Sequence, residues 1–113
     1  MYKPWAYVSS AWDEDSRKAK KIAKKYCRQL YNAGYTPICP LISFMDLLDD
    51  EKADEHRDYL DMSEELLRRS RILVVCGTVV DETVKNDVAV ANRYFIASST
   101  LEGVLSVDKT RKG

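Results

Sequence analysis

Glycine is scarce in this sequence, with four residues among 113. Loops that cradle phosphate groups, of the GxxxxGK or GxGxxG type, need several closely spaced glycines so that the backbone can approach the phosphates. Neither motif is present. The sequence therefore disfavours a nucleoside triphosphatase and a standard dinucleotide oxidoreductase.

Residues that bind metals or form disulfides are also few. The three cysteines, Cys27, Cys39 and Cys76, form no CxxC pair and have no histidine beside them. We expect them to be small buried apolar residues. The single histidine, His56, lies in a strongly polar stretch, and we expect it to be a solvated helix residue. No metal site, disulfide framework or cofactor is predicted.

Charge of one sign is not in excess, because 18 Lys and Arg residues balance 18 Asp and Glu residues. Nonspecific binding to nucleic acid or to a membrane surface depends on excess positive charge, so neither partner is predicted. The lysine-rich face of the first expected helix is interpreted as a solvated surface. No apolar run approaches the ~20 residues of a transmembrane helix, and no signal segment is recognised, so a cytoplasmic protein is expected.

The length and the hydrophobic share of 45% are those of one globular domain. We expect this domain to span residues 1–107 and to be followed by a charged tail over residues 108–113. A domain of this size has no second lobe to close over a substrate. A homo-oligomer, a dimer or larger, is therefore expected, with the apolar segment Leu41 to Leu48 as the candidate contact.

Hydrophobic periodicity predicts strands that alternate with helices along the chain. The helices are expected at 55–69, at 83–93 and from Asp13 or Asp15 to residue 33, where Gly34 suits the left-handed end of a helix. The strands are expected at 5–10, 35–39, 71–76 and 94–98. Segment 41–48 is a loop or a short helix, and Ser99 to Glu102 has the spacing of a capping box before one last short helix.

This alternation is typical of a three-layer α/β fold, Rossmann-like or flavodoxin-like, with a mostly parallel sheet of four to five strands and helices on both faces. Ligands of such folds bind beyond the carboxyl ends of the strands. The candidate residues there are Ser9, Ser10, Trp12, Gly77, Asp81, Glu82 and Asp87. Together they provide hydroxyl groups, an aromatic ring, a glycine and carboxylates. That set suits a sugar or a nucleoside, because a ring stacks on a base, hydroxyls bind sugar or phosphate, and a carboxylate can attack an anomeric carbon.

The sequence resembles the nucleoside 2-deoxyribosyltransferase-like family, in particular its small branch from bacteria and mobile elements. The resemblance spans most of the chain. It is carried by Tyr7-Val8-Ser9-Ser10-Ala11-Trp12, Tyr26-Cys27, Gly34-Tyr35-Thr36-Pro37-Ile38-Cys39-Pro40, Leu48-Asp49-Asp50, Leu66-Leu67-Arg68-Arg69-Ser70, Val74-Val75-Cys76-Gly77, Asp81, Asp87 and Ala91.

The resemblance implies a reaction at an N-glycosidic bond. In the family, a Glu on the helix after the third strand attacks the sugar, and Asp87 occupies that place here. The family's preceding Asp is retained as Asp81, which would assist. Where the family commonly has further Asp residues, this chain has Ser63 and Arg71, and Leu41 replaces a His of the small branch.

Two other functions stay open at this stage. The chain could be a catalytically silent module that senses nucleotides, or an oligomeric scaffold that binds no ligand. Asp81 and Asp87 are also ordinary residues for the first turns of a helix. Trp12 could cover the end of the sheet or a subunit contact, and Ser9 and Ser10 could serve the turn alone.

Overall fold

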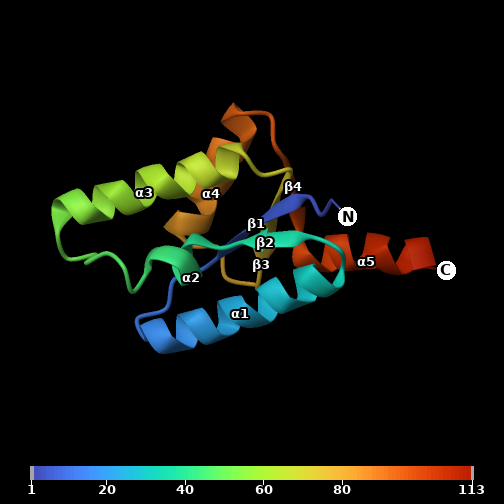
Figure 1. The fold of residues 1–113 in the computed structure, drawn as a ribbon, viewed down its shortest axis with the longest axis horizontal. Coiled ribbons are helices and arrows are strands. Elements are labelled where there is room, and N and C mark those ends of the chain that lie inside the picture. Colours follow the sequence, from blue (N-terminus) through green and yellow to red (C-terminus); the bar gives the residue numbers. More distant parts are fainter. Residues whose placement is uncertain (1, 113) are drawn as a thin grey trace.

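The computed structural model describes the backbone of residues 2–112 and the side chains of residues 2–106 (Figure 1). Within these residues the chain forms strands and helices in alternation. Their bounds are β1 (Trp5–Ser10), α1 (Ser16–Asn32), β2 (Thr36–Ile38), α2 (Pro40–Phe44), α3 (Ala53–Arg68), β3 (Ile72–Cys76), α4 (Glu82–Arg93), β4 (Ala97–Thr100) and α5 (Leu101–Lys112). The charged tail expected over 108–113 lies outside the residues whose side chains are described.

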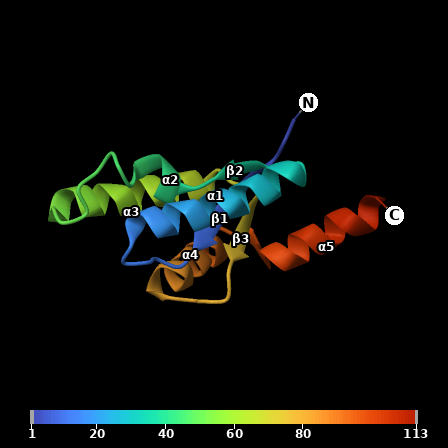
Figure 2. The ribbon, with the colours of Figure 1, turned by 90° about the horizontal axis from the view of Figure 1, so that it is seen from below.

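The four described strands form one sheet in the order β2-β1-β3-β4, and every neighbouring pair is parallel. This confirms the predicted α/β fold. Figure 2 shows β2, β1 and β3 in that order from the top of the view. From β1 the chain crosses to β2 on one side of the sheet, and it later crosses back past β1 to β3. The carboxyl ends of β1 and β3 therefore flank the point where the strand order reverses, which is where ligands of open α/β sheets bind.

The core lies in two layers because successive side chains of a strand point to opposite faces of the sheet. On one face, Ala6 and Val8 pack with α1, α2 and α5, whereas on the other face Tyr7 packs with α3 and α4. Figure 1 shows these helix groups on the two sides of the sheet. The side chain of Ser9 follows that of Tyr7 and faces α4.

The ends of α1 illustrate how local residues set the element boundaries. Of the two candidate caps, Asp15 is the one used: its Oδ1 accepts hydrogen bonds from the backbone N–H groups of Arg17 and Lys18, at 3.1 and 3.3 Å. At the other end, Gly34 has a φ of 100°, which terminates the helix in the left-handed conformation as expected.

The fourth strand differs from its prediction. Tyr94 ends α4, and Phe95 adopts a φ of 58°, so the chain turns here and the strand begins only at Ala97. The prediction of a strand from residue 94 was wrong because it rested on an apolar run of aromatic and β-branched residues. Such a run is typical of a strand, but the same residues can also form a turn. The last helix is capped by Thr100 and not by Ser99, since the Thr100 hydroxyl accepts from the N–H of Gly103 at 3.0 Å.

The segment 41–48, expected to be a loop or a short helix and a subunit contact, begins within α2. Leu41 is buried in the core, whereas Leu47 is 67% exposed. Leu47 is thus the most exposed large apolar residue of this segment and the one that remains free to meet another chain. None of the helices in the described part of the chain is long and apolar enough to cross a membrane.

Candidate functional site

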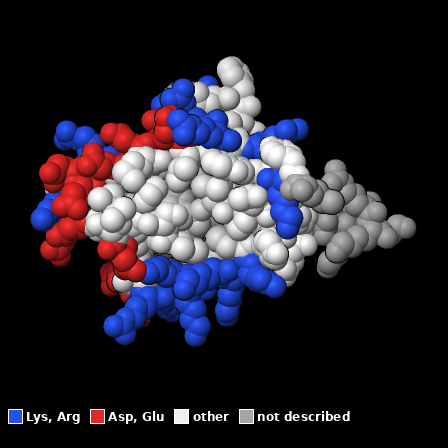
Figure 3. All heavy atoms as spheres, in the orientation of Figure 1, with Lys and Arg blue, Asp and Glu red and all other residues white. Residues whose placement is uncertain are grey.

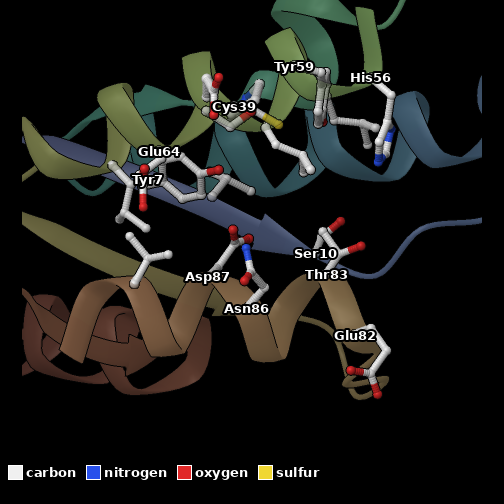
Figure 4. Close-up of a pocket in the computed structure, with 18 of the residues that line it drawn as sticks. Tyr7, Ser10, Cys39, His56, Tyr59, Glu64, Glu82, Thr83, Asn86 and Asp87 are labelled. Atoms are coloured by element: carbon white, nitrogen blue, oxygen red, sulfur yellow. The ribbon is translucent and has the colours of Figure 1, made fainter. Parts of the chain in front are cut away.

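A cavity of about 430 Å³ lies between the sheet and helices α3 and α4, at the carboxyl end of β1 (Figure 4). Its walls come from β1, from the residues after β2, from α3 and from α4. The side chains with polar groups that line it are Tyr7, Ser10, Cys39, His56, Tyr59, Asp61, Ser63, Glu64, Glu82, Thr83, Asn86, Asp87 and Arg93. The cavity therefore gathers residues that are up to 86 positions apart in the sequence.

Asp87 projects from α4 into this cavity. The hydroxyl of Ser9, on the facing strand, donates a hydrogen bond of 2.7 Å to its Oδ2. Burial raises the pKa of the Asp87 carboxyl to about 6; the hydrogen bond from Ser9 lowers it and the charge of Asp81 adds to the increase. Oδ2 is thus held by Ser9, whereas Oδ1 accepts no hydrogen bond from any of the described residues. A partly buried carboxylate with a raised pKa in a cavity is a typical feature of reactive sites.

Asp81 takes a different position from Asp87, although both were predicted as site residues. It caps α4, with Oδ1 accepting from the N–H of Val84 at 3.0 Å, and its Oδ2 accepts from the N–H of Trp12 at 2.8 Å. Asp81 is not among the residues that line the cavity. Its geometry fixes the loop after β1 to the start of α4, and it acts on Asp87 through its charge.

Ser10, Trp12 and Gly77 line a second cavity, of about 210 Å³, on the face of the sheet that carries α1. Ser10 also lines the first cavity, so it lies between the two. Trp12 is 48% exposed, and its ring does not line the cavity of Asp87. The predicted site residues are therefore divided: Ser9, Ser10 and Asp87 lie together, whereas Trp12 and Gly77 lie across the sheet end.

Gly77 is required by the local backbone. Its φ is 84°, which L side chains rarely adopt, and a Cβ at this position would lie 3.0 Å from Oη of Tyr26. Glycine therefore allows the chain to turn at the end of β3, close to the side chain of Tyr26 on α1. Its role as a ligand contact stays a prediction.

Two tyrosines form part of the cavity wall. Tyr7 is 3% exposed, and burial raises the pKa of its phenol well above the ordinary value, with a further contribution from the charge of Asp87. Burial likewise raises the pKa of Tyr59, on α3. The hydrophobic pattern of the two elements does not show that these rings form a cavity wall. The one available signal was the hydroxyl group, which needs a polar partner when buried.

Ser63, on α3, is 7% exposed, and its Oγ is buried without a hydrogen-bond partner among the described residues. It lines the cavity. The phenol of Tyr7, which also lines the cavity, lies beside this hydroxyl, because an interaction with Ser63 partly offsets the increase in the pKa of Tyr7.

The α3 wall is acidic. Asp61 and Glu64 line it, and the one Lys or Arg among the described lining residues, Arg93, pairs with Glu64 at 3.5 Å. Figure 4 shows Glu82 pointing away from the cavity centre. His56 also lines the cavity, and its Nδ1 lies 2.5 Å from Oδ1 of Asp50. Its side chain is 49% exposed on α3, which agrees with the expectation of a solvated helix residue.

The cysteines are free thiols, and Cys39 and Cys76 are buried as expected, with Cys27 partly buried. Cys39 lines the cavity. A hydrogen bond from Cys27 lowers the pKa of Cys39, and the same interaction raises the pKa of Cys27. In the described part of the chain no group of three or more His, Cys, Asp or Glu side chains is arranged to hold a metal ion.

The parallel sheet, its two helix layers and the acidic cavity at the carboxyl end of β1 define an α/β protein of the doubly wound class. Over residues 4–100 the sequence matches the family described as a domain of unknown function, DUF7768, and the chain belongs to this family. The match ends at the last residue of β4, before α5. No curated protein matches the sequence.

Proposed function

We propose that this chain binds a nucleoside in the cavity of Asp87 and cleaves or transfers its N-glycosidic bond, as a relative of the nucleoside 2-deoxyribosyltransferases. The observation that carries the proposal is the Asp87 carboxylate, held by Ser9 at 2.7 Å inside a cavity of about 430 Å³. Sequence resemblance and geometry lead to the same residue.

In the proposed reaction, Oδ1 of Asp87 attacks the anomeric carbon while the bond from that carbon to the base nitrogen breaks. The base leaves with the electron pair and takes up a proton, and the sugar is joined to Asp87 as an ester. Water or a second base then attacks the same carbon and releases the carboxylate. Ser9 orients the carboxylate by holding Oδ2.

The pKa of Asp87 gives the proposed reaction a pH dependence. The nucleophile must be ionised, and the carboxyl has a pKa of about 6. The rate is therefore expected to rise as pH increases through about 6 and to level off above about 7. Ser9→Ala removes the hydrogen bond that lowers this pKa, so the rise moves to higher pH.

The charges of the cavity favour a nucleoside over a nucleotide. Asp61, Glu64 and Asp87 line it, and the guanidinium of Arg93 is already paired with Glu64. A phosphate would bring further negative charge into a site with no unpaired Lys or Arg among its described lining residues. The hydroxyl of Ser63 and the amide of Asn86 are suited to the neutral polar edges of a base or sugar.

The proposal is tested by incubating the protein with a panel of ribonucleosides, deoxyribonucleosides and their 5′-monophosphates and measuring free base by chromatography. Asp87→Ala is expected to reduce base release by at least about 10³-fold. Asp58→Asn, on the exposed surface of α3, is the matched control and retains the activity. Failure of the wild-type protein to release base from any compound, or full activity in Asp87→Ala, would refute catalysis.

A second candidate is the catalytically silent sensing module, with a nucleoside as its ligand in place of the expected nucleotide because of these charges, and the length of Asp87 favours it. Asp is one methylene shorter than the Glu of the family, about 1.5 Å of reach, and a displacement of that order can cost ~100-fold in rate. A rise in melting temperature with a nucleoside, without base release, would indicate sensing. The expected homo-oligomer is a separate question, which light scattering answers directly.

A further inference from the structure

Helix α1 carries seven positive charges and no negative one. They are Arg17, Lys18, Lys20, Lys21, Lys24, Lys25 and Arg28. At about 100° per residue all seven fall within an arc of roughly 160°, on the side of the helix opposite to the buried Ala19, Ala23 and Leu30. We call this arc the α1 cationic face.

The charges that make the chain neutral overall lie elsewhere. Figure 3 shows blue atoms along α1 and red atoms gathered at the end of the molecule where α3 begins. Lys20 pairs with Asp46, but none of the other six cations of the α1 cationic face has a carboxylate within ion-pair distance among the described side chains. Those six side chains are exposed.

This arrangement has an energetic cost within the helix. Like charges recur three or four positions apart, as in Arg17–Lys21, Lys21–Lys25 and Lys24–Arg28, and each such pair destabilises the helix. No acidic residue of α1 offsets them. A polyanion bound to the surface of α1 would offset these repulsions.

We propose that the α1 cationic face binds the phosphate backbone of double-stranded nucleic acid without regard to sequence. From residue 17 to residue 28 the helix rises about 17 Å, and one strand of a duplex carries about five phosphates over that length. Six unpaired cations on a rigid support match that row. The expectation of no nucleic-acid partner rested on net charge, whereas binding depends on charge gathered on one face.

A membrane surface fits the α1 cationic face less well. Helices that lie on bilayers bury an apolar side in the lipid, but the apolar side of α1 is covered by the sheet. The α1 cationic face also lies across the sheet from Asp87, so its role is independent of the proposed reaction.

Fluorescence anisotropy with a labelled 20-bp DNA duplex, at salt concentrations from 50 to 200 mM, tests the proposal. Four to five phosphate contacts predict a slope of about −4 for log affinity against log salt, a loss of roughly 10²-fold over this range. The combined variant Lys21→Gln, Lys24→Gln and Lys25→Gln is expected to bind at least about tenfold more weakly at 50 mM salt, with the slope reduced by nearly 3. A duplex of scrambled sequence is expected to bind equally well.

The matched control is Lys52→Gln, Arg57→Gln and Lys85→Gln, which removes the same charge from exposed positions outside α1. It is expected to bind within about twofold of the wild type. Circular dichroism is expected to show that the α1 variant melts no lower than the wild type, since it loses like-charge pairs. The proposal is overturned if the two variants weaken binding equally or no duplex binds at 50 mM salt. It is also overturned if the α1 cationic face instead mediates salt-sensitive self-association or capture by phosphatidylserine vesicles.

Discussion

Replacing Asp87 with Asn tests whether this carboxylate is held in an environment that disfavours its charge. Asn has the same shape, and its Oδ1 can still accept the hydrogen bond from Ser9. The change therefore removes the negative charge and leaves the packing of α4 against the sheet in place. The measured quantity is the free energy of unfolding as a function of pH.

The expected magnitude follows from the pKa of Asp87, which is about 6 in the folded protein against an ordinary value of 3.8. Each pKa unit corresponds to about 1.4 kcal/mol, so ionised Asp87 costs the folded state about 3 kcal/mol. As pH rises from 3.8 to about 6, the unfolded chain loses this proton first, while the folded protein still holds it. The stability of the wild type therefore falls through this window and stays low above it.

Asp87→Asn is expected to be about 3 kcal/mol more stable than the wild type at pH 8 and nearly equal to it at pH 4. In a protein of this size such a gain raises the melting temperature by roughly 10–20 °C. Urea unfolding followed by circular dichroism at several pH values measures the difference, with Asp58→Asn as the control for an exposed carboxylate. A difference that does not change with pH, or a less stable variant at pH 8, would refute the reasoning.

Three further tests concern caps and backbone conformations elsewhere in the chain. Asp81→Ala removes the cap of α4 and the contact with the N–H of Trp12. Urea unfolding should therefore show a free energy of unfolding that is lower by about 1–2 kcal/mol. A decrease of less than about 0.5 kcal/mol would contradict the assigned role. Gly77→Ala should lower the free energy of unfolding by about 1–2 kcal/mol. Adding Tyr26→Phe removes the hydroxyl that the new Cβ would meet, so it should restore only the part of this loss that is due to crowding. Phe95 is 96% exposed with a φ of 58°, so Phe95→Gly should stabilise the protein by up to about 1 kcal/mol, and a lower melting temperature would contradict this.

Strong local signals made most of the fold predictable. The strand 5–10 was predicted at its observed bounds, and β3 and α4 each differ by one residue at the start. β3 is a continuous apolar run closed by Gly77, and α4 combines a helical period with its cap, Asp81. The error at β4 arose because Tyr94 to Ile96 carry no capping residue or glycine, and the turn there is made by a left-handed Phe95.

The candidate site was predictable only in part. Ser9, Ser10 and Asp87 were chosen because the carboxyl ends of parallel strands meet at one edge, and the structure brings these three together. The wall formed by α3 could not be found in this way. Its residues are typical of an ordinary amphipathic helix, and Ser63 and Tyr59 become notable only because of what the sheet places opposite them.

The sequence by itself determined the alternation of strands and helices, and with it the parallel sheet, because period, caps and turn glycines act over a few residues. Only the tertiary structure decided the environment of each carboxylate. Asp81 and Asp87 look equivalent in sequence, yet backbone N–H groups bind both oxygens of Asp81, whereas burial raises the pKa of Asp87. It also decided that six of the seven cations of α1 have no carboxylate within ion-pair distance among the described side chains. Desolvation and Coulomb interactions depend on distances in space, and a sequence records only distances along the chain.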